Sequence, residues 1–60
     1  MKDFKFVETS IDSEGLHRGK LYKLDAEGNE VFVEESSYEK IARFIPDEDI
    51  ELVVEHIALS

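Results

Sequence analysis

Apolar and polar residues alternate along the first half of the chain, as in strands that bury one face. The alternating segments are residues 4–11 (FKFVETSI), 16–24 (LHRGKLYKL) and 30–34 (EVFVE). They are rich in aromatic, β-branched and leucine residues, so we expect three strands. Phe4 and Phe6 fall on one face of the first strand. Gly19, inside the second, is typical of a bulge or of a close approach between two backbones.

Two polar segments separate these strands and predict turns. DSEG follows the first strand, and DAEGN follows the second. DAEGN is the stronger signal, because Gly28 adopts a positive φ at little cost and the Asp25 side chain can close the turn. In the strand after it, Phe32 is expected on the face opposite to that of its two valine neighbours.

The segment EESSYEKIARFIPDEDI, residues 34–50, carries a helix signal between two acidic clusters. Ser36 and Glu39 have the spacing of a capping box, in which each side chain binds a free amide at the helix start. Apolar residues at helical spacing form one face: Tyr38, Ile41, Ala42, Phe44 and Ile45. Pro46 ends the helix, because it lacks an N–H and disfavours helical geometry in the residue before it. A helix of about ten residues is marginal alone and must pack on the sheet.

The segment IELVVEHIAL, residues 50–59, alternates again and predicts a final strand. Apolar side chains lie on both of its faces, whereas one helix covers only one face of a sheet. The uncovered face is expected to receive a second protomer. The pattern therefore predicts a single α+β domain over residues 1–60, with an antiparallel sheet of three or four strands and one short helix, that forms a homodimer.

The length and composition limit how this domain can be stabilised. A chain of 60 residues buries only about 60% of the surface that its unfolded form exposes. It has no cysteine, which excludes disulfides and cysteine-based zinc sites. The segment MKDFKFVETS lacks the apolar core of a signal peptide, and no run approaches the roughly 18 apolar residues of a membrane span. We expect a soluble, cytoplasmic protein without membrane contact.

The charge is unevenly distributed. The formal net charge is −8; residues 1–24 hold five Lys/Arg against four Asp/Glu, and residues 25–60 hold two against eleven. The first part therefore carries +1 and the second −9. A field of this sign repels phosphates, so direct binding to nucleic acid is not expected. The matching partner is a basic protein surface, and many such surfaces are basic because they hold DNA or RNA.

Two acidic clusters flank the predicted helix. Negative charge is favourable near a helix start, so Glu34, Glu35 and Glu39 are explained by the helix dipole. The cluster Asp47–Asp49 lies past the helix end, where cations are favoured. Acidic residues at a position that favours cations bring no evident structural benefit, so this cluster points to a function, here to partner binding. The alternative is an ordinary solvated turn.

Neither a metal centre nor a catalytic site is predicted. His17 and His56 have no metal-ligand spacing, and the acidic neighbour Glu55 points to the opposite strand face from His56. The serines lack a nucleophile-elbow motif, and Ser36 is explained as a helix cap. We therefore expect a protein that is not an enzyme and that needs no cofactor. Tyr38 is either a core residue or, at the helix edge beside Glu39, an aromatic anchor for a partner protein.

The segment SSYE and its surroundings resemble the small acidic inhibitors of uracil-DNA glycosylase made by protein-primed phages of Gram-positive bacteria. The similarity covers the DAEGN hairpin, the SSYEKIARF helix and the strand IELVVEHIAL, roughly residues 20–59. In that family a Ser-x-aromatic-Glu sequence begins a short helix, and Tyr38 and Glu39 match the aromatic–Glu pair. The chain departs from the family in a shorter hairpin-to-helix connection, in Tyr38 where the family has Phe, and in Ala42 where it has a second aromatic.

The resemblance implies a function for these residues. Such inhibitors are dimers of a three-stranded antiparallel sheet with one helix, and they occupy the DNA-binding cleft of the host glycosylase as DNA mimics. Tyr38, beside Ala42, would line a pocket for the apolar side chain that the enzyme inserts into the minor groove, and Glu39 would hydrogen-bond to the enzyme's loop. The carboxylates that would replace DNA phosphates are Glu34, Glu35, Asp47, Glu48 and Asp49. The alternative is an acidic interaction module that acts on another basic, nucleic-acid-binding host protein.

Overall fold

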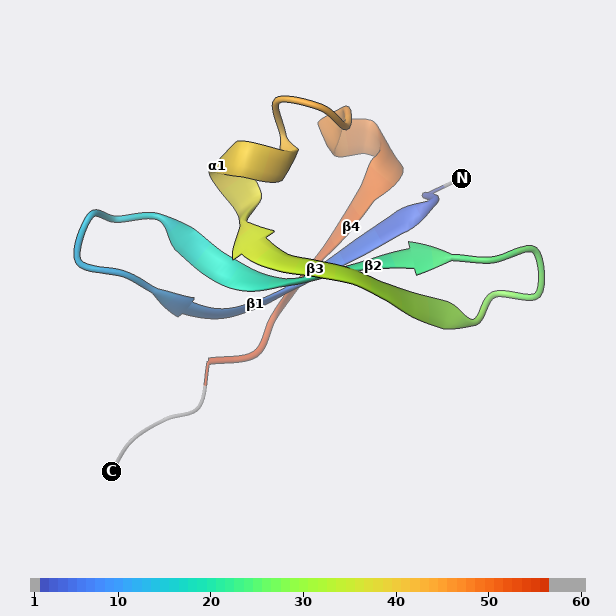
Figure 1. The fold of residues 1–60 in the computed structure, drawn as a ribbon, viewed down its shortest axis with the longest axis horizontal. Coiled ribbons are helices and arrows are strands. Elements are labelled where there is room, and N and C mark those ends of the chain that lie inside the picture. Colours follow the sequence, from blue (N-terminus) through green and yellow to red (C-terminus); the bar gives the residue numbers. More distant parts are fainter. Residues whose placement is uncertain (1, 57–60) are drawn as a thin grey trace.

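The computed structural model describes residues 2–56 and shows a four-stranded sheet with one short helix (Figure 1). The strand order is β3-β2-β1-β4. In chain order the elements are β1 (Phe4–Ile11), β2 (His17–Leu24), β3 (Glu30–Ser37), α1 (Tyr38–Ile41), the 3-10 turn η1 (Asp47–Asp49) and β4 (Ile50–Val54). The α+β class, the four strands and the single short helix are confirmed. Residues 57–59, which were expected to continue the last strand, lie outside the described part.

The sheet is mixed, so the prediction of an antiparallel sheet is wrong for one pair of strands. β1, β2 and β3 are antiparallel neighbours, whereas β4 runs parallel to β1, with Phe4 opposite Ile50 and Phe6 opposite Leu52. A parallel neighbour needs a crossover of about a dozen residues. Residues 38–49, which hold α1 and η1, supply that crossover. The predicted alternation in β4 holds, and only its direction was misjudged.

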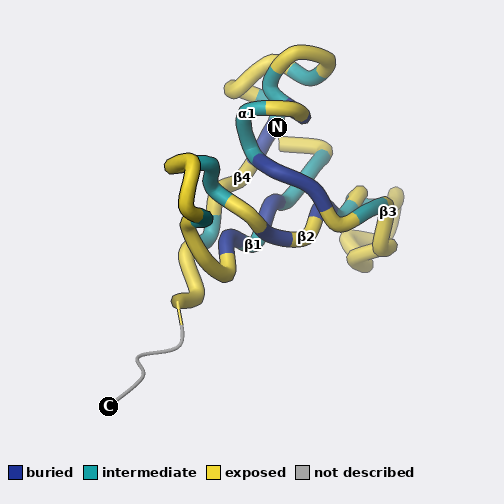
Figure 2. The backbone as a smooth tube through the Cα atoms, turned by 60° about the vertical axis from the view of Figure 1, so that its left-hand side comes forward, coloured by how far each residue is buried: buried dark blue, intermediate teal, exposed yellow. Residues whose placement is uncertain are grey.

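The core is small and lies between the sheet and the crossover. Its buried side chains are Phe6, Leu21, Ile41 and Ile50, and the partly buried Phe4, Tyr38 and Ile45 pack against it. The alternation of β1 accounts for this arrangement, since the face that carries Phe6 meets Leu21 of β2 directly. In Figure 2 the buried parts of the backbone gather where the strands pass beneath α1.

The helix is shorter than predicted and begins one residue later. α1 has four residues, and Ser37, not Ser36, is its N-cap: the Ser37 hydroxyl accepts a hydrogen bond from the Lys40 N–H at 3.2 Å. Ser36 is instead a buried β3 residue opposite Gly19. The chain tightens after Ile41, since the N–H of Arg43 bonds to the Lys40 carbonyl and that of Phe44 to the Ile41 carbonyl. These i→i+3 bonds belong to a tighter 3-10 turn, and one i→i+4 bond, from the Ile45 N–H to the Ile41 carbonyl, follows before Pro46.

Gly19 permits a backbone contact that no other residue would allow. It is buried opposite Glu8, where the register of β1 and β2 shifts. A Cβ atom at Gly19 would lie 2.0 Å from the carbonyl oxygen of Val7. Of the two alternatives predicted for Gly19, the close approach is confirmed; the bulge lies in the facing strand, where Thr9 is the extra residue of β1. The DAEGN turn is confirmed too: Gly28 has a φ of 85°, and an Asp25 side-chain oxygen accepts from the Glu27 and Asn29 amides at 2.9 and 2.8 Å.

A second irregularity lies in β3. Val31 pairs with Lys23 and Phe32 with Tyr22, so these two neighbours point to opposite faces, as expected. Glu34 then pairs with Leu21, which leaves Val33 without a partner in the ladder. Val33 is therefore a bulge residue rather than a regular companion of Val31.

One face of the sheet is left without a covering element in the described part of the chain. α1 packs over β2 and β3 on the Phe6 side. The far face carries Val7, Tyr22, Phe32 and Val53, which the strand register places on one side. No helix formed by residues 2–56 has the length and apolarity needed to cross a membrane.

We expect Gly19→Ala to destabilise the protein by about 3 kcal/mol or more, because the added methyl group meets backbone atoms that cannot give way. Gly28→Ala is the matched control: it strains a positive φ in open space and is expected to cost about 1 kcal/mol. Thermal unfolding followed by circular dichroism compares the two. Equal losses of stability in the two variants would contradict the close contact between Gly19 and the backbone of Val7.

Candidate protein-binding site

The best-formed hollow on the described surface lies beside α1, on the Phe6 side of the sheet. Its volume is about 400 Å³, and its lining combines carboxylates, an imidazole, a phenol and aliphatic side chains: Glu8, His17, Tyr38, Glu39, Leu52 and Val54. These residues come from β1, β2, α1 and β4. Four separate elements therefore build one site.

The hollow exists because α1 is too short to cover the whole face. Leu52 and Val54 share that face, since they lie opposite Phe6 and Glu8 of β1. The single turn of α1 packs over β2 and β3 and leaves these two side chains 48% and 58% exposed. Aliphatic groups at this exposure, beside an aromatic ring, form a surface suited to burial by a partner.

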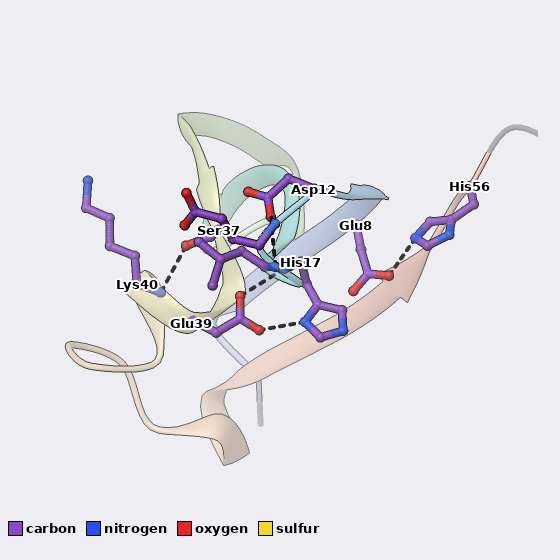
Figure 3. A network of polar contacts seen from close by, with 9 residues as sticks. Glu8, Asp12, His17, Ser37, Glu39, Lys40 and His56 are labelled. Atoms are coloured by element: carbon purple, nitrogen blue, oxygen red, sulfur yellow. Dashed lines mark hydrogen bonds and ion pairs between the residues drawn. The ribbon is translucent and has the colours of Figure 1, made fainter.

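One wall is fixed by a pair between α1 and the start of β2. Glu39 Oε1 accepts the His17 backbone N–H at 2.9 Å, and Glu39 Oε2 lies 2.5 Å from His17 Nδ1 (Figure 3). The hydrogen bond to Glu39 raises the pKa of His17, and the same contact lowers the pKa of Glu39. The capping box predicted for Glu39 is therefore wrong, because the Glu39 carboxylate accepts a hydrogen bond from the His17 amide of β2 rather than from an amide at the start of the helix.

A second pair closes the opposite end of the hollow. Glu8 Oε2 lies 2.6 Å from His56 Nε2, just past β4 (Figure 3). The Glu8 side chain is only 6% exposed, whereas that of His56 is 39% exposed. The Glu55 N–H also donates to the Glu8 carbonyl at 2.8 Å, which extends the contact between β1 and the chain after β4.

Tyr38 is a core residue, which is one of the two roles considered for it, and it also borders the hollow. Its ring meets Phe6 edge to face, with 5.7 Å between centroids and an interplanar angle of 69°, which makes it part of the core. Partial burial, and secondarily the negative charge of Asp47, raise the pKa of its hydroxyl.

The other candidate residues are distributed over several surfaces. Ala42 is the half-buried C-cap of α1. Glu34 lies opposite Leu21 on the hollow side, 3.8 Å from Lys40 Nζ, whereas Glu35 lies opposite Lys20 on the far face. The structure thus brings Tyr38 and Glu39 together in the hollow and separates Glu35 from them.

The acidic cluster after the helix forms a separate 3-10 turn and does not lie at the end of a long helix, as was expected. Asp47, Glu48 and Asp49 form η1, and the Asp49 N–H donates to the Pro46 carbonyl at 2.9 Å. They are therefore not an extension of α1, whose single turn has only a small dipole. The conflict with the helix dipole largely disappears, and the exposed charge of Asp47 and Glu48 remains.

Sequence reasoning missed Glu8, His17, Leu52 and Val54 as site residues. One signal was present: the alternation of Phe4, Phe6 and Glu8 places a carboxylate at a core position of β1. Long-range pairing decided the rest, because the partners of Glu8 and His17 are 48 and 22 residues away. Within residues 2–56, no group of three His, Asp or Glu side chains is arranged to hold a metal ion.

These features define a small α+β domain with an acidic, partly apolar hollow. Comparisons with known proteins gave no match to a family model, to a curated protein or to a solved structure. The resemblance described above therefore rests on the quoted residues alone.

The raised pKa of His17 gives a direct test of the first pair. We expect Glu39→Gln to lower the His17 pKa toward its ordinary 6.5, because the main cause of the shift is removed. Histidine resonances followed by NMR over a pH titration measure it. Glu14→Gln, an exposed substitution of equal charge, is the control and should leave the His17 pKa in place. Equal pKa values in both variants would contradict the pairing.

The same pair sets a pH window for stability. The raised His17 pKa contributes stability that is complete below 6.5 and is lost as pH rises through the raised value. The lowered Glu39 pKa contributes above 4.5 and is lost as pH falls through the lowered value. The pair therefore stabilises the fold most between about pH 4.5 and 6.5.

Proposed function

We propose that this protein is an acidic interaction module that occupies the nucleic-acid-binding surface of a basic partner protein. The observation that carries the proposal is the hollow lined by Tyr38, Leu52 and Val54 and edged by carboxylates. An aromatic and aliphatic patch within an acidic surround has the composition of an interface hot spot. It offers burial for one projecting side chain of the partner.

The charge of the chain supports a basic partner. Residues 25–60, which include β3, α1, η1 and β4, carry −9, whereas residues 1–24 carry +1. Asp47 lies close enough to Tyr38 to influence the pKa of its hydroxyl, so this charge reaches the hollow. Such a field accelerates association with a positive surface and opposes association with nucleic acid itself.

The resemblance names a particular target, the host uracil-DNA glycosylase, in the host cytoplasm. In this proposal the acidic surface replaces DNA in the enzyme's cleft, and the protein acts as an inhibitor rather than as an enzyme. Leu52 and Val54 take the place of the second helix aromatic that Ala42 lacks, since they complete the apolar wall beside Tyr38. The fold differs from the family description in its fourth strand, which is parallel to β1.

We further propose that the protein is a homodimer formed through the far face of the sheet. Val53, Val7, Tyr22 and Phe32 form a diagonal apolar band across all four strands. Three cations and four anions surround the band on this face: Lys5, Arg18, Lys20, Glu30, Glu35, Glu51 and Glu55. In a chain of net charge −8, a face whose charges nearly cancel allows two copies to approach without strong repulsion.

We expect the purified protein to block uracil release by a glycosylase at near-stoichiometric amounts and to leave bare DNA unshifted in a gel. Tyr38→Ala should weaken inhibition by about 2 kcal/mol, as for an interface hot spot. Tyr38→Phe keeps the ring and should retain most of the affinity. Unchanged uracil release in excess protein would refute the glycosylase as target, and a shift of bare DNA would refute the repulsive role of the charge.

For the dimer, sedimentation equilibrium at micromolar concentration should give twice the 6.9 kDa protomer mass. Phe32→Ser removes the most exposed aromatic of the far face and should weaken the dimer roughly tenfold or more. Phe44→Ser is the control, because Phe44 is 79% exposed and follows α1. A monomeric wild type, or equal effects of both substitutions, would contradict the proposed interface.

A further inference from the structure

The floor of the hollow carries a carboxylate with one oxygen that has no hydrogen-bond partner among residues 2–56. Glu8 is 5% exposed and lines the hollow. Its Oε2 pairs with His56, and its other oxygen, Oε1, has no hydrogen-bond partner among residues 2–56. No fully buried side-chain oxygen in that part of the chain lacks a partner, so Oε1 keeps some solvent access. Because Glu8 is otherwise buried and lines the hollow, we infer that this access leads into the hollow.

The walls of the hollow are apolar, in contrast to the carboxylate on its floor. The Tyr38 ring and the aliphatic side chains of Leu52 and Val54 face the same space. An apolar guest would bury these walls but would also strip water from Glu8 Oε1 without replacing its hydrogen bond, which is unfavourable. A guest with an apolar stem and a cationic head would satisfy both surfaces, as the side chains of lysine and arginine do.

We propose that the hollow binds one basic side chain of the partner, preferably an arginine, with its head on Glu8 and its stem against Tyr38, Leu52 and Val54. Arginine is preferred because a guanidinium stacks on aromatic rings as well as donating to carboxylates. The proposal rests on the proposed function, in which the partner surface is basic. It replaces the apolar guest that the resemblance implies.

The charged groups around the hollow give this binding a pH dependence. The titratable groups around the hollow are the carboxyl groups of Glu8 in β1, Glu39 in α1 and Asp47 in η1, and the imidazoles of His17 in β2 and His56 beyond β4. As pH falls through the raised pKa of His17, a cation forms beside Glu8 and opposes a second one. Arginine binding should therefore weaken on acidification.

The test is an NMR titration of the full chain with three small probes: N-acetylarginine amide, N-acetylcitrulline amide and N-acetylleucine amide. Citrulline keeps the shape of arginine without its charge. We expect arginine to shift the resonances of the hollow residues and to bind at least tenfold more tightly than the other two, with weaker binding at lower pH. Leucine or citrulline binding as tightly as arginine would overturn the proposal, as would arginine shifts confined to residues outside the hollow.

A pair of charge-matched variants completes the test. Glu8→Gln should weaken arginine binding at least tenfold, whereas Glu35→Gln, on the far face, should change it less than twofold. Equal effects would overturn the proposal, and should Glu8→Gln not fold, the three probes on the wild type still decide it. The glycosylase assay separates the two proposals: inhibition without arginine binding refutes only this inference, and arginine binding without inhibition refutes only the glycosylase target.

Discussion

The packing of one helical turn on Phe6 governs the architecture of this protein. Ile41 and Tyr38 of α1 contact the central strand through Phe6, and Ile50 joins the same core as the chain returns. Because only four apolar side chains are buried within residues 2–56, each accounts for a large part of the hydrophobic stabilisation of that part of the chain. The crossover that carries this turn also fixes the parallel direction of β4.

The same small core explains why polar groups sit so close to the apolar ones. A longer helix would have covered Leu52 and Val54 and left no space in front of Glu8. With a single turn, the two Glu–His pairs tie the ends of the uncovered region together, from β2 to α1 and from β1 to the chain after β4. The contribution of the His17–Glu39 pair is largely positional, since both of its side chains are well exposed and exposed ion pairs add little stability.

Much of the fold could be predicted from local pattern, and the site could not. The alternation around Phe6, the close approach at Gly19 and the turn at Gly28 are consequences of side-chain period and glycine geometry, which neighbouring residues reveal. The direction of β4 depends on the path of the crossover. The helix length and the role of Glu39 depend on competition by the His17 amide, which is 22 residues distant. Tyr38 was found because an aromatic residue at a helix start stands out in the sequence, whereas Leu52 and Val54 look like any strand residues.

The bulge at Val33 has a consequence for how the chain behaves among copies of itself. Among the described residues β3 is one of the two outer strands of the sheet, so one side of its backbone has no strand partner there, and its Val31–Val33 segment is apolar and about half exposed. Unprotected strands of this kind seed aggregates. The bulge breaks the regular spacing of the free amides and carbonyls, and Glu30, Glu34 and Glu35 place like charges along any added copy. The irregular backbone of the bulge and the negative charge of the strand together therefore protect this edge against pairing with further copies of the chain.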